Sequence, residues 1–213
     1  QQDDLGYFQV EMNFKLGRFK KALKLGKVEI EKAEGETLSQ LSKILGESHF
    51  NLEEYEAALG YLKNYKGRNG KWNHVDYFQL GYTYYKTNDY TNAIDQFNKI
   101  IVKKNALSQS AYYYLAECYL MNESESKSAA LNAYKSSSSM KYNPKISQAA
   151  LLNYARLSHE IGNPYEQVPT VIIRFLESYP NAEEKEEMTA LLLDSYTNSG
   201  NYDGVIKLLE SRG

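Results

Sequence analysis

Cysteine is almost absent from this sequence, since Cys118 is the single one among 213 residues. One cysteine cannot build a disulfide framework or a cysteine-based metal site. Cys118 lies inside the apolar run YYYLAECYL, so we expect a buried thiol that behaves as a small hydrophobic side chain.

Long apolar runs are absent as well. No stretch reaches the roughly 18 apolar residues of a membrane-spanning helix, and no signal peptide is visible. Because the chain starts with Gln1 rather than Met and stops at Gly213, we expect a piece of a longer protein. The missing signal therefore says little about the native location, and we predict no direct membrane insertion by this piece.

A strong charge of one sign is also missing. The formal net charge is −2, and the Lys and Arg residues are scattered rather than clustered. Bulk electrostatics therefore predicts no nucleic-acid partner. Segments that alternate apolar and polar residues with period two are not found, so we expect no strands.

Tyrosine, by contrast, is abundant, with 20 residues of this type. Its large apolar ring and polar tip suit contacts between helices that end in water. We expect most of these side chains to pack between helices. The remaining tyrosines are candidates to line a recognition groove.

Two distant stretches share one pattern. The chain reads LGYTYYKTNDYTNAIDQF from Leu80 and LLDSYTNSGNYDGVIKLL from Leu192. Each has a Tyr four residues after its first residue, then a turn with Asn or Gly, then a second Tyr. Such copies indicate a repeated helix–turn–helix unit, which cannot bury its apolar face alone. We therefore predict a stack of helix pairs whose function belongs to its surface.

Four further units can be aligned with these two. The residues equivalent to Leu80 recur every 35 to 39 positions, at Gln9, Leu45, Leu80, Leu115, Tyr154 and Leu192. We predict one array over residues 1–213, with units at about 3–34, 36–66, 74–105, 108–139, 145–180 and 183–211.

The pattern resembles the tetratricopeptide repeat (TPR), whose period is about 34 residues. The third unit fills every position of the family pattern, with Leu80, Gly81, Tyr84, Asn88, Tyr90, Ala93 and Phe97. Pro164 and the stretch ESES at Glu123–Ser126 depart from it by lengthening two turns. The resemblance implies an all-α fold, a right-handed α-solenoid of about six helix–turn–helix units.

Small residues in the repeat have a physical role. Gly46, Gly81 and their equivalents Ala116 and Ala155 let two helices approach closely, with bulky side chains opposite them. Gly and Asn at the turns accept the left-handed backbone that ends a helix. After Pro180 ends the second helix of the fifth unit, we expect Asn181 to cap the next helix.

Catalytic and metal-binding patterns are weak. GRNGK at 67–71 lacks the spacing and the Ser or Thr of a phosphate-binding loop, so we interpret it as a turn between units. SESK at 124–127 has no companion motif of a serine acyl-enzyme. His49, His74 and His159 lack metal-ligand spacing. We therefore expect no catalytic residue, no metal and no cofactor.

The resemblance also indicates a surface. In this family the first helix of each unit lines a concave groove, and the matching positions predict the residues that face a partner. They are Phe14, Lys43, Glu47, Phe50, Phe78, Tyr82, Tyr85, Tyr113, Glu117, Arg156 and His159. Such a wall suits a peptide with apolar and basic side chains. The alternative is that these aromatic residues only pack between adjacent first helices.

We thus expect a non-catalytic scaffold that binds a peptide or partner protein in the groove; its oligomeric state is left open. The phrase FLESYPNA at 175–182 is similar to bacterial envelope TPR proteins. These are BamD/YfiO-type outer-membrane assembly lipoproteins and Tol–Pal-associated periplasmic proteins. This resemblance implies a periplasmic or outer-membrane-associated protein. The alternatives are a cytoplasmic sensor or regulatory module of a larger protein, and a solenoid that binds glycans or the cell wall.

Overall fold

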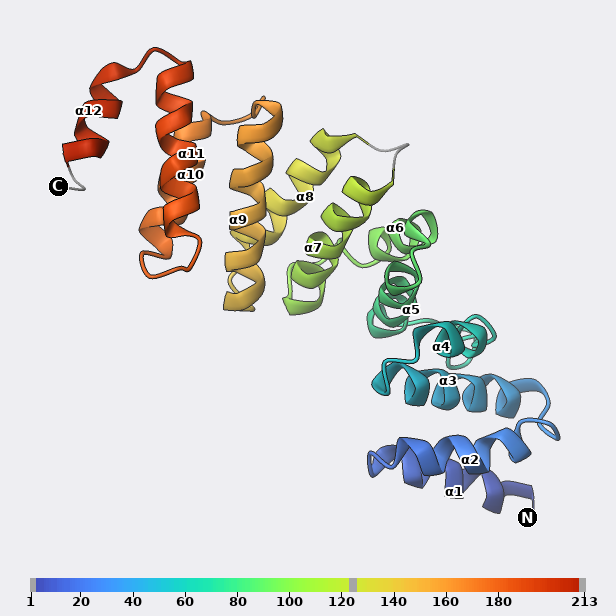
Figure 1. The fold of residues 1–213 in the computed structure, drawn as a ribbon. Coiled ribbons are helices and arrows are strands. Elements are labelled where there is room, and N and C mark those ends of the chain that lie inside the picture. The colour runs from blue at the N-terminus through green and yellow to red at the C-terminus, as the bar shows by residue number, and fades with distance from the viewer. Residues whose placement is uncertain (1–2, 123–125, 211–213) are drawn as a thin grey trace. The chain divides into compact units, whose positions relative to one another are not determined.

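The computed structural model describes residues 3–122 and 126–210, and within them it contains twelve helices and no strand (Figure 1). The all-α prediction is confirmed. The helices are α1 (Asp3–Lys15), α2 (Phe19–Glu29), α3 (Gly35–Asn51), α4 (Tyr55–Leu62), α5 (His74–Lys86), α6 (Tyr90–Asn98), α7 (Ala106–Met121), α8 (Lys127–Ser139), α9 (Pro144–Ile161), α10 (Val168–Ser178), α11 (Lys185–Asn198) and α12 (Tyr202–Glu210). None of these twelve helices combines the length and the apolar character needed to cross a bilayer.

The helices pair into hairpins, and the chain divides after Val102 into two compact parts. From here on we call residues 1–102 the first unit and residues 103–213 the second unit, and each contains three of the hairpins. In the first unit α1 packs on α2, α3 on α4 and α5 on α6, and each hairpin contacts the next. In the second unit the pairs are α7 with α8, α9 with α10, and α11 with α12. The six predicted helix–turn–helix pairs are therefore present, while a single array over residues 1–213 stays a prediction. Most of the ESES turn, residues 123–125, lies outside the described residues.

The turns follow the predicted chemistry, with one exception. Gly17, Asn88 and Gly162 have positive φ angles of 70°, 60° and 71°, which is the left-handed backbone expected after a helix. The prediction that Asn181 caps α11 is wrong. The helix begins at Lys185 and its N-cap residue is Glu184, because the chain first makes another turn after Pro180.

The predicted contacts between small and bulky residues are confirmed. A Cβ atom added to Gly81 would lie 3.0 Å from the Phe97 ring, and Phe97 is fully buried on α6. Gly26 makes a similar approach that the repeat pattern did not indicate. A Cβ there would overlap Cδ2 of Leu45, so α2 and α3 also touch through a glycine. Cys118 is fully buried as predicted, and burial raises the pKa of its thiol to about 12.

The segment at 67–73 is a tight turn, as interpreted from the sequence. Arg68 and Lys71 exchange backbone hydrogen bonds of 3.0 and 3.1 Å, and Asn69 and Gly70 between them have positive φ angles. This is the geometry of a two-residue type I′ turn. The turn places the Trp72 ring against Tyr77 of α5.

A buried polar contact joins the first three helices of the second unit. The Gln109 side chain on α7 is fully buried. Its amide Nε2 donates to the Met140 carbonyl at 2.6 Å and to Ser147 Oγ at 2.8 Å, and its Oε1 accepts the Asn143 N–H at 2.8 Å. One side chain thereby satisfies the backbone that connects α8 to α9.

Candidate functional site

Aromatic side chains gather on α3, α4 and α5 of the first unit. We use the name aromatic cluster for Phe50, Tyr55, Phe78, Tyr82 and Tyr85, all of which are half-buried. The spacing of 78, 82 and 85 follows the helix period, so the three residues share one face of α5. Of the predicted site residues, Phe50, Phe78, Tyr82 and Tyr85 are therefore brought together.

Tyr82 is the centre of the aromatic cluster. Its ring centroid lies 5.7 Å from Phe50, 5.9 Å from Tyr55 and 6.0 Å from Tyr85. Most of these contacts are edge-on or tilted, which aromatic rings prefer over face-to-face stacking. The Phe50–Tyr82 contact bridges two adjacent first helices, so the packing interpretation holds in part. Because the rings stay half-exposed, they also present an apolar surface to solvent.

Lys43 and Glu47, which share a face of α3 with Phe50 by their spacing, form an ion-pair network. The Lys43 ammonium donates to Asp76 and lies 3.8 Å from Glu47, while Asp76 also accepts the Asn73 N–H at 2.8 Å and so caps α5. Burial tends to lower the pKa of Lys43, but its hydrogen bond to Asp76 and the Glu47 charge outweigh that effect and raise it. Burial raises the pKa of Glu47 despite the opposing charge of Lys43.

Phe14 does not join the aromatic cluster. It packs on Phe19 at 5.8 Å and against the core formed by Val10, Ala22, Leu41 and Ile44. Phe14 therefore packs at the contact between the first hairpin and α3.

Tyr113 and Glu117 come together in the second unit. Glu117 accepts a hydrogen bond from the Tyr134 hydroxyl and lies 3.3 Å from the Asn153 amide. The Tyr113 ring packs on Tyr134 at 5.9 Å. Burial, followed by the Glu117 charge, raises the pKa of Tyr113. Glu117 thus links α7 to both α8 and α9.

Arg156 and His159 on α9 pair with carboxylates on α11. The Arg156 guanidinium makes two bonds to Glu187, of 2.7 and 2.6 Å, and His159 Nε2 lies 2.7 Å from Asp194 Oδ2. The hydrogen bond to Arg156 lowers the pKa of Glu187. These two predicted site residues therefore connect neighbouring hairpins.

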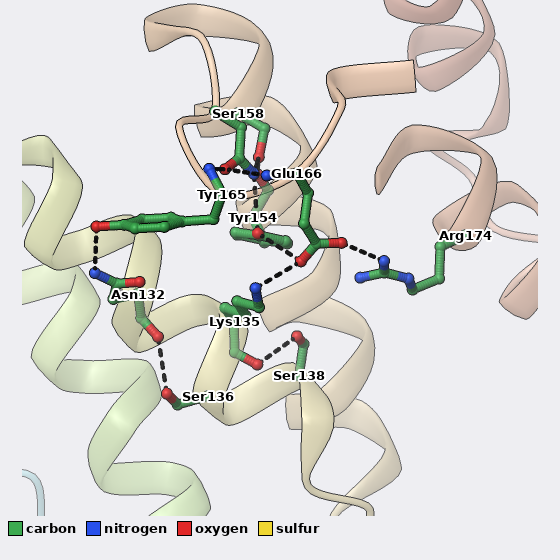
Figure 2. Close-up of polar contacts among 10 residues, drawn as sticks. Asn132, Lys135, Ser136, Ser138, Tyr154, Ser158, Tyr165, Glu166 and Arg174 are labelled. Carbon is green, nitrogen blue, oxygen red and sulfur yellow. Dashed lines mark hydrogen bonds and ion pairs between the residues drawn. The ribbon is translucent and has the colours of Figure 1, made fainter. Parts of the chain in front are cut away.

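Glu166 was not predicted from the sequence. Its carboxylate accepts hydrogen bonds from three side chains in the second unit (Figure 2). Its Oε1 accepts from the Tyr154 hydroxyl at 3.0 Å and from Lys135 Nζ at 2.9 Å, and its Oε2 accepts from Arg174. Burial would raise the pKa of this carboxyl, but the hydrogen bonds from Arg174, Lys135 and Tyr154 together lower it to about 2. The sequence offered little signal, because Glu166 sits in a lengthened turn.

Replacing Glu166 tests this network. Because its pKa falls from the ordinary 4.5 to about 2, the contribution of Glu166 to stability is complete above pH 4.5 and is lost between pH 4.5 and about 2. One pKa unit corresponds to about 1.4 kcal/mol, and the half-exposed partners are screened by solvent, so we expect Glu166→Gln to cost about 1–2 kcal/mol at pH 7. Urea unfolding at several pH values measures this difference.

Glu160 provides the matched control. It pairs with Lys127 on the surface, where both side chains are more than half exposed. We expect Glu160→Gln to change the free energy of unfolding by less than about 0.5 kcal/mol. A pH-independent cost of Glu166→Gln, or equal costs for both variants, would contradict the assignment.

Metal-ligand geometry is not found in residues 3–122 and 126–210, where no three His, Cys, Asp or Glu side chains could hold one ion. His49 instead lies in a packing position. It is buried, stacks on Tyr61 at 5.6 Å and contacts Glu54 Oε2 through Nδ1 at 2.6 Å.

Comparisons with known proteins agree with this architecture. The family model described as the tetratricopeptide repeat matches residues 78–140. The crystal structure of MamA is similar over 85% of this chain and 96% of its own, with a TM-score of 0.62 and 20% identity. These findings support a tetratricopeptide-repeat protein. No curated protein matches the chain.

Two further solved structures are more distant. One is the C-terminal part of a TPR repeat-containing protein from Cytophaga hutchinsonii. The match spans 96% of this chain and 93% of that structure's chain, with 14% identity and a TM-score of 0.49. A TPR repeats protein from Bacteroides fragilis covers 98% and 96%, with 14% identity and a TM-score of 0.44. At such distances we draw nothing from them about a partner.

Proposed function

We propose that this chain is a non-catalytic scaffold whose aromatic cluster binds a peptide or a partner protein. The tetratricopeptide fold suggests protein–protein interaction, and proteins of this kind are generally non-catalytic. The observation that carries the proposal is the cluster itself, in which five adjacent aromatic rings on α3, α4 and α5 remain half-exposed.

The chemistry of the surface defines the kind of partner. Tyr and Phe are enriched at binding hot spots because they bury a large area at a small cost in side-chain entropy. Beside them, Asp76 and Glu47 share one Lys43, which leaves this group with a net charge of −1. The surface is therefore suited to a segment with apolar and basic side chains.

Replacing two of the half-buried rings tests the proposal. A peptide library displayed on phage is selected on the purified chain, and the dissociation constants of the selected peptides are measured. We expect peptides rich in apolar, Lys and Arg residues, and a loss of affinity of at least about tenfold in the Tyr82→Ala, Tyr85→Ala double variant. Phe78 is left in place because it packs on the buried Phe97 at 5.8 Å.

Tyr202→Ala is the matched control, since Tyr202 is 67% exposed on α12. Its affinity for the selected peptides should equal that of the parent. Unchanged affinity in the double variant, with an intact circular dichroism spectrum, would remove the aromatic cluster as the site. Selection of glycans rather than peptides in a parallel glycan screen would favour the carbohydrate-binding alternative.

The periplasmic or outer-membrane-associated location also stays a proposal. It rests on the resemblance of residues 175–182 to bacterial envelope proteins. The N-terminal sequence of the whole protein tests it. A lipoprotein signal would support a role in the assembly of bacterial envelope complexes. An appended kinase or DNA-binding domain would support the cytoplasmic regulatory alternative.

A further inference from the structure

A pocket of about 600 Å³ lies among α8, α9 and α10 in the second unit, and none of its lining residues belongs to the proposed peptide surface. This volume is typical of small-molecule sites. Residues from the end of α8, the start of α9 and the end of α10 line it, together with Lys141 from the connection between α8 and α9.

The pocket is basic. Lys135, Lys141 and Arg174 line it, and no Asp or Glu is among its lining residues in the described part of the chain. Lys135 and Arg174 both form ion pairs with Glu166, which is not one of the lining residues. Figure 2 shows both cations directed at this one carboxylate. One negative charge faces three positive ones, so a net charge of about +2 remains.

Several donors are left for a ligand. Arg174 uses only Nη2 toward Glu166, so Nε and Nη1 have no partner among the described residues. Each of these two groups can donate a hydrogen bond to an oxygen of a carboxylate or phosphate, and they lie on different edges of the guanidinium because Cδ is between them. Lys141 is exposed and likewise has no partner within residues 3–122 and 126–210. The Ser178 and Tyr179 hydroxyls add two further donors at the rim.

The rest of the lining mixes the three serines Ser138, Ser139 and Ser147 with apolar surface. Leu151, which is buried, and Pro144 contribute that apolar surface, together with the Tyr179 ring. Inorganic phosphate would leave these surfaces uncovered, whereas an apolar group attached to the anion would fill them. The pocket therefore combines cationic side chains with a partly apolar lining.

Lys99, at the matching position of the first unit, is used differently. Lys99 lies nine residues after Tyr90, as Arg174 lies nine residues after Tyr165. Lys99 Nζ contacts Asp95 at 2.8 Å and lies 5.4 Å from the Tyr77 ring, and the pocket beside it measures about 260 Å³. This pocket is smaller, and its cation is already occupied by protein groups.

We propose that the pocket among α8, α9 and α10 binds an organic anion, which is a carboxylate or phosphate group carried on an apolar body. This site is independent of the aromatic cluster. The volume of the pocket fits a free small molecule rather than an extended segment.

Isothermal titration with four probes tests the proposal. Phenyl phosphate and 3-phenylpropionate carry the anion and an apolar ring, inorganic phosphate lacks the ring, and benzyl alcohol lacks the charge. We expect one of the two aromatic anions to bind with one-to-one stoichiometry, and whichever binds more tightly identifies the anionic group. Binding should weaken as salt is added.

Four variants complete the test. We expect Arg174→Gln and Lys141→Gln each to weaken binding of the better probe by about tenfold, since each removes a charged donor. Lys141 has no structural partner in the described residues, so its replacement leaves the fold intact even where Arg174→Gln lowers stability. Lys99→Gln, a cation of similar exposure in the first unit, should bind like the parent, as should the Tyr82→Ala, Tyr85→Ala variant.

Four results would overturn the proposal. The first is no binding of either aromatic anion. The second is equal binding of inorganic phosphate, and the third is equal binding of benzyl alcohol. The fourth is unchanged affinity in Lys141→Gln and Arg174→Gln.

Discussion

Gln109→Glu is expected to destabilise the protein by about 3 kcal/mol or more at pH 7, since it removes a donor from a fully buried network. The Nε2 atom of Gln109 lies 2.6 Å from the Met140 carbonyl oxygen and 2.8 Å from Ser147 Oγ. A carboxylate oxygen in its place would face the Met140 oxygen with no hydrogen between them. Denaturant unfolding, followed by circular dichroism, measures the loss.

The loss should also depend on pH. The buried carboxyl group that Gln109→Glu introduces, without a cation nearby, would have a raised pKa, and its protonated form would restore one donor. Folding would then take up a proton, so the deficit relative to the parent shrinks as the pH falls toward the ordinary pKa of a glutamic acid. We therefore expect a smaller deficit at pH 4 than at pH 7.

Gln148→Glu is the control, because Gln148 is half-buried on α9 and has no polar partner among the described residues. We expect a change within about 0.5 kcal/mol. A cost below about 1 kcal/mol for Gln109→Glu would mean that Gln109 is not the link between α7 and the α8–α9 connection.

Gly46→Val is expected to cost about 3 kcal/mol, at the upper end for overpacking of a tight core. A Cβ atom at Gly46 would lie 2.7 Å from Cγ and Cδ2 of Leu62 and 3.1 Å from the Leu62 backbone nitrogen. Leu62 is itself buried, so it cannot move aside without opening the contact between α3 and α4. Thermal and denaturant unfolding both report this cost.

Gly60→Val provides the opposite case on α4. A Cβ atom at Gly60 meets nothing within 4 Å, and the residue is exposed. Valine has the higher helix propensity, so we expect no loss and a gain of up to about 0.5 kcal/mol. Equal costs at positions 46 and 60 would show that backbone preference, rather than close helix packing, accounts for the geometry of the hairpin.

The helices were predictable because their determinants are local and repeated. Leu80, Gly81, Tyr84 and Ala93 each recur at the same place in other units, so a weak preference in one copy is supported by the others. The close approach at Gly46 followed from the same pattern. The aromatic cluster was found in part, since Phe78, Tyr82 and Tyr85 share one helical face, whereas Tyr55 belongs to a second helix and was not expected there.

The polar contacts were not predictable, because the residues that form them lie far apart in the sequence. Gln109 binds residues 31 to 38 positions later in the chain, and Lys43 binds Asp76, 33 positions later. Such pairs depend on the exact register of neighbouring hairpins and on side-chain rotamers. One signal for Gln109 existed: it lies seven residues before Ala116, on the tightly packed face of the same helix.

Asp76 has two roles, because it completes the capping box of α5 with Asn73 and also accepts a hydrogen bond from Lys43. An incoming acidic side chain would have to draw Lys43 from a carboxylate that is already buried, and Glu47 would repel it at the same time. The proposed peptide surface would therefore disfavour a partner rich in Asp or Glu.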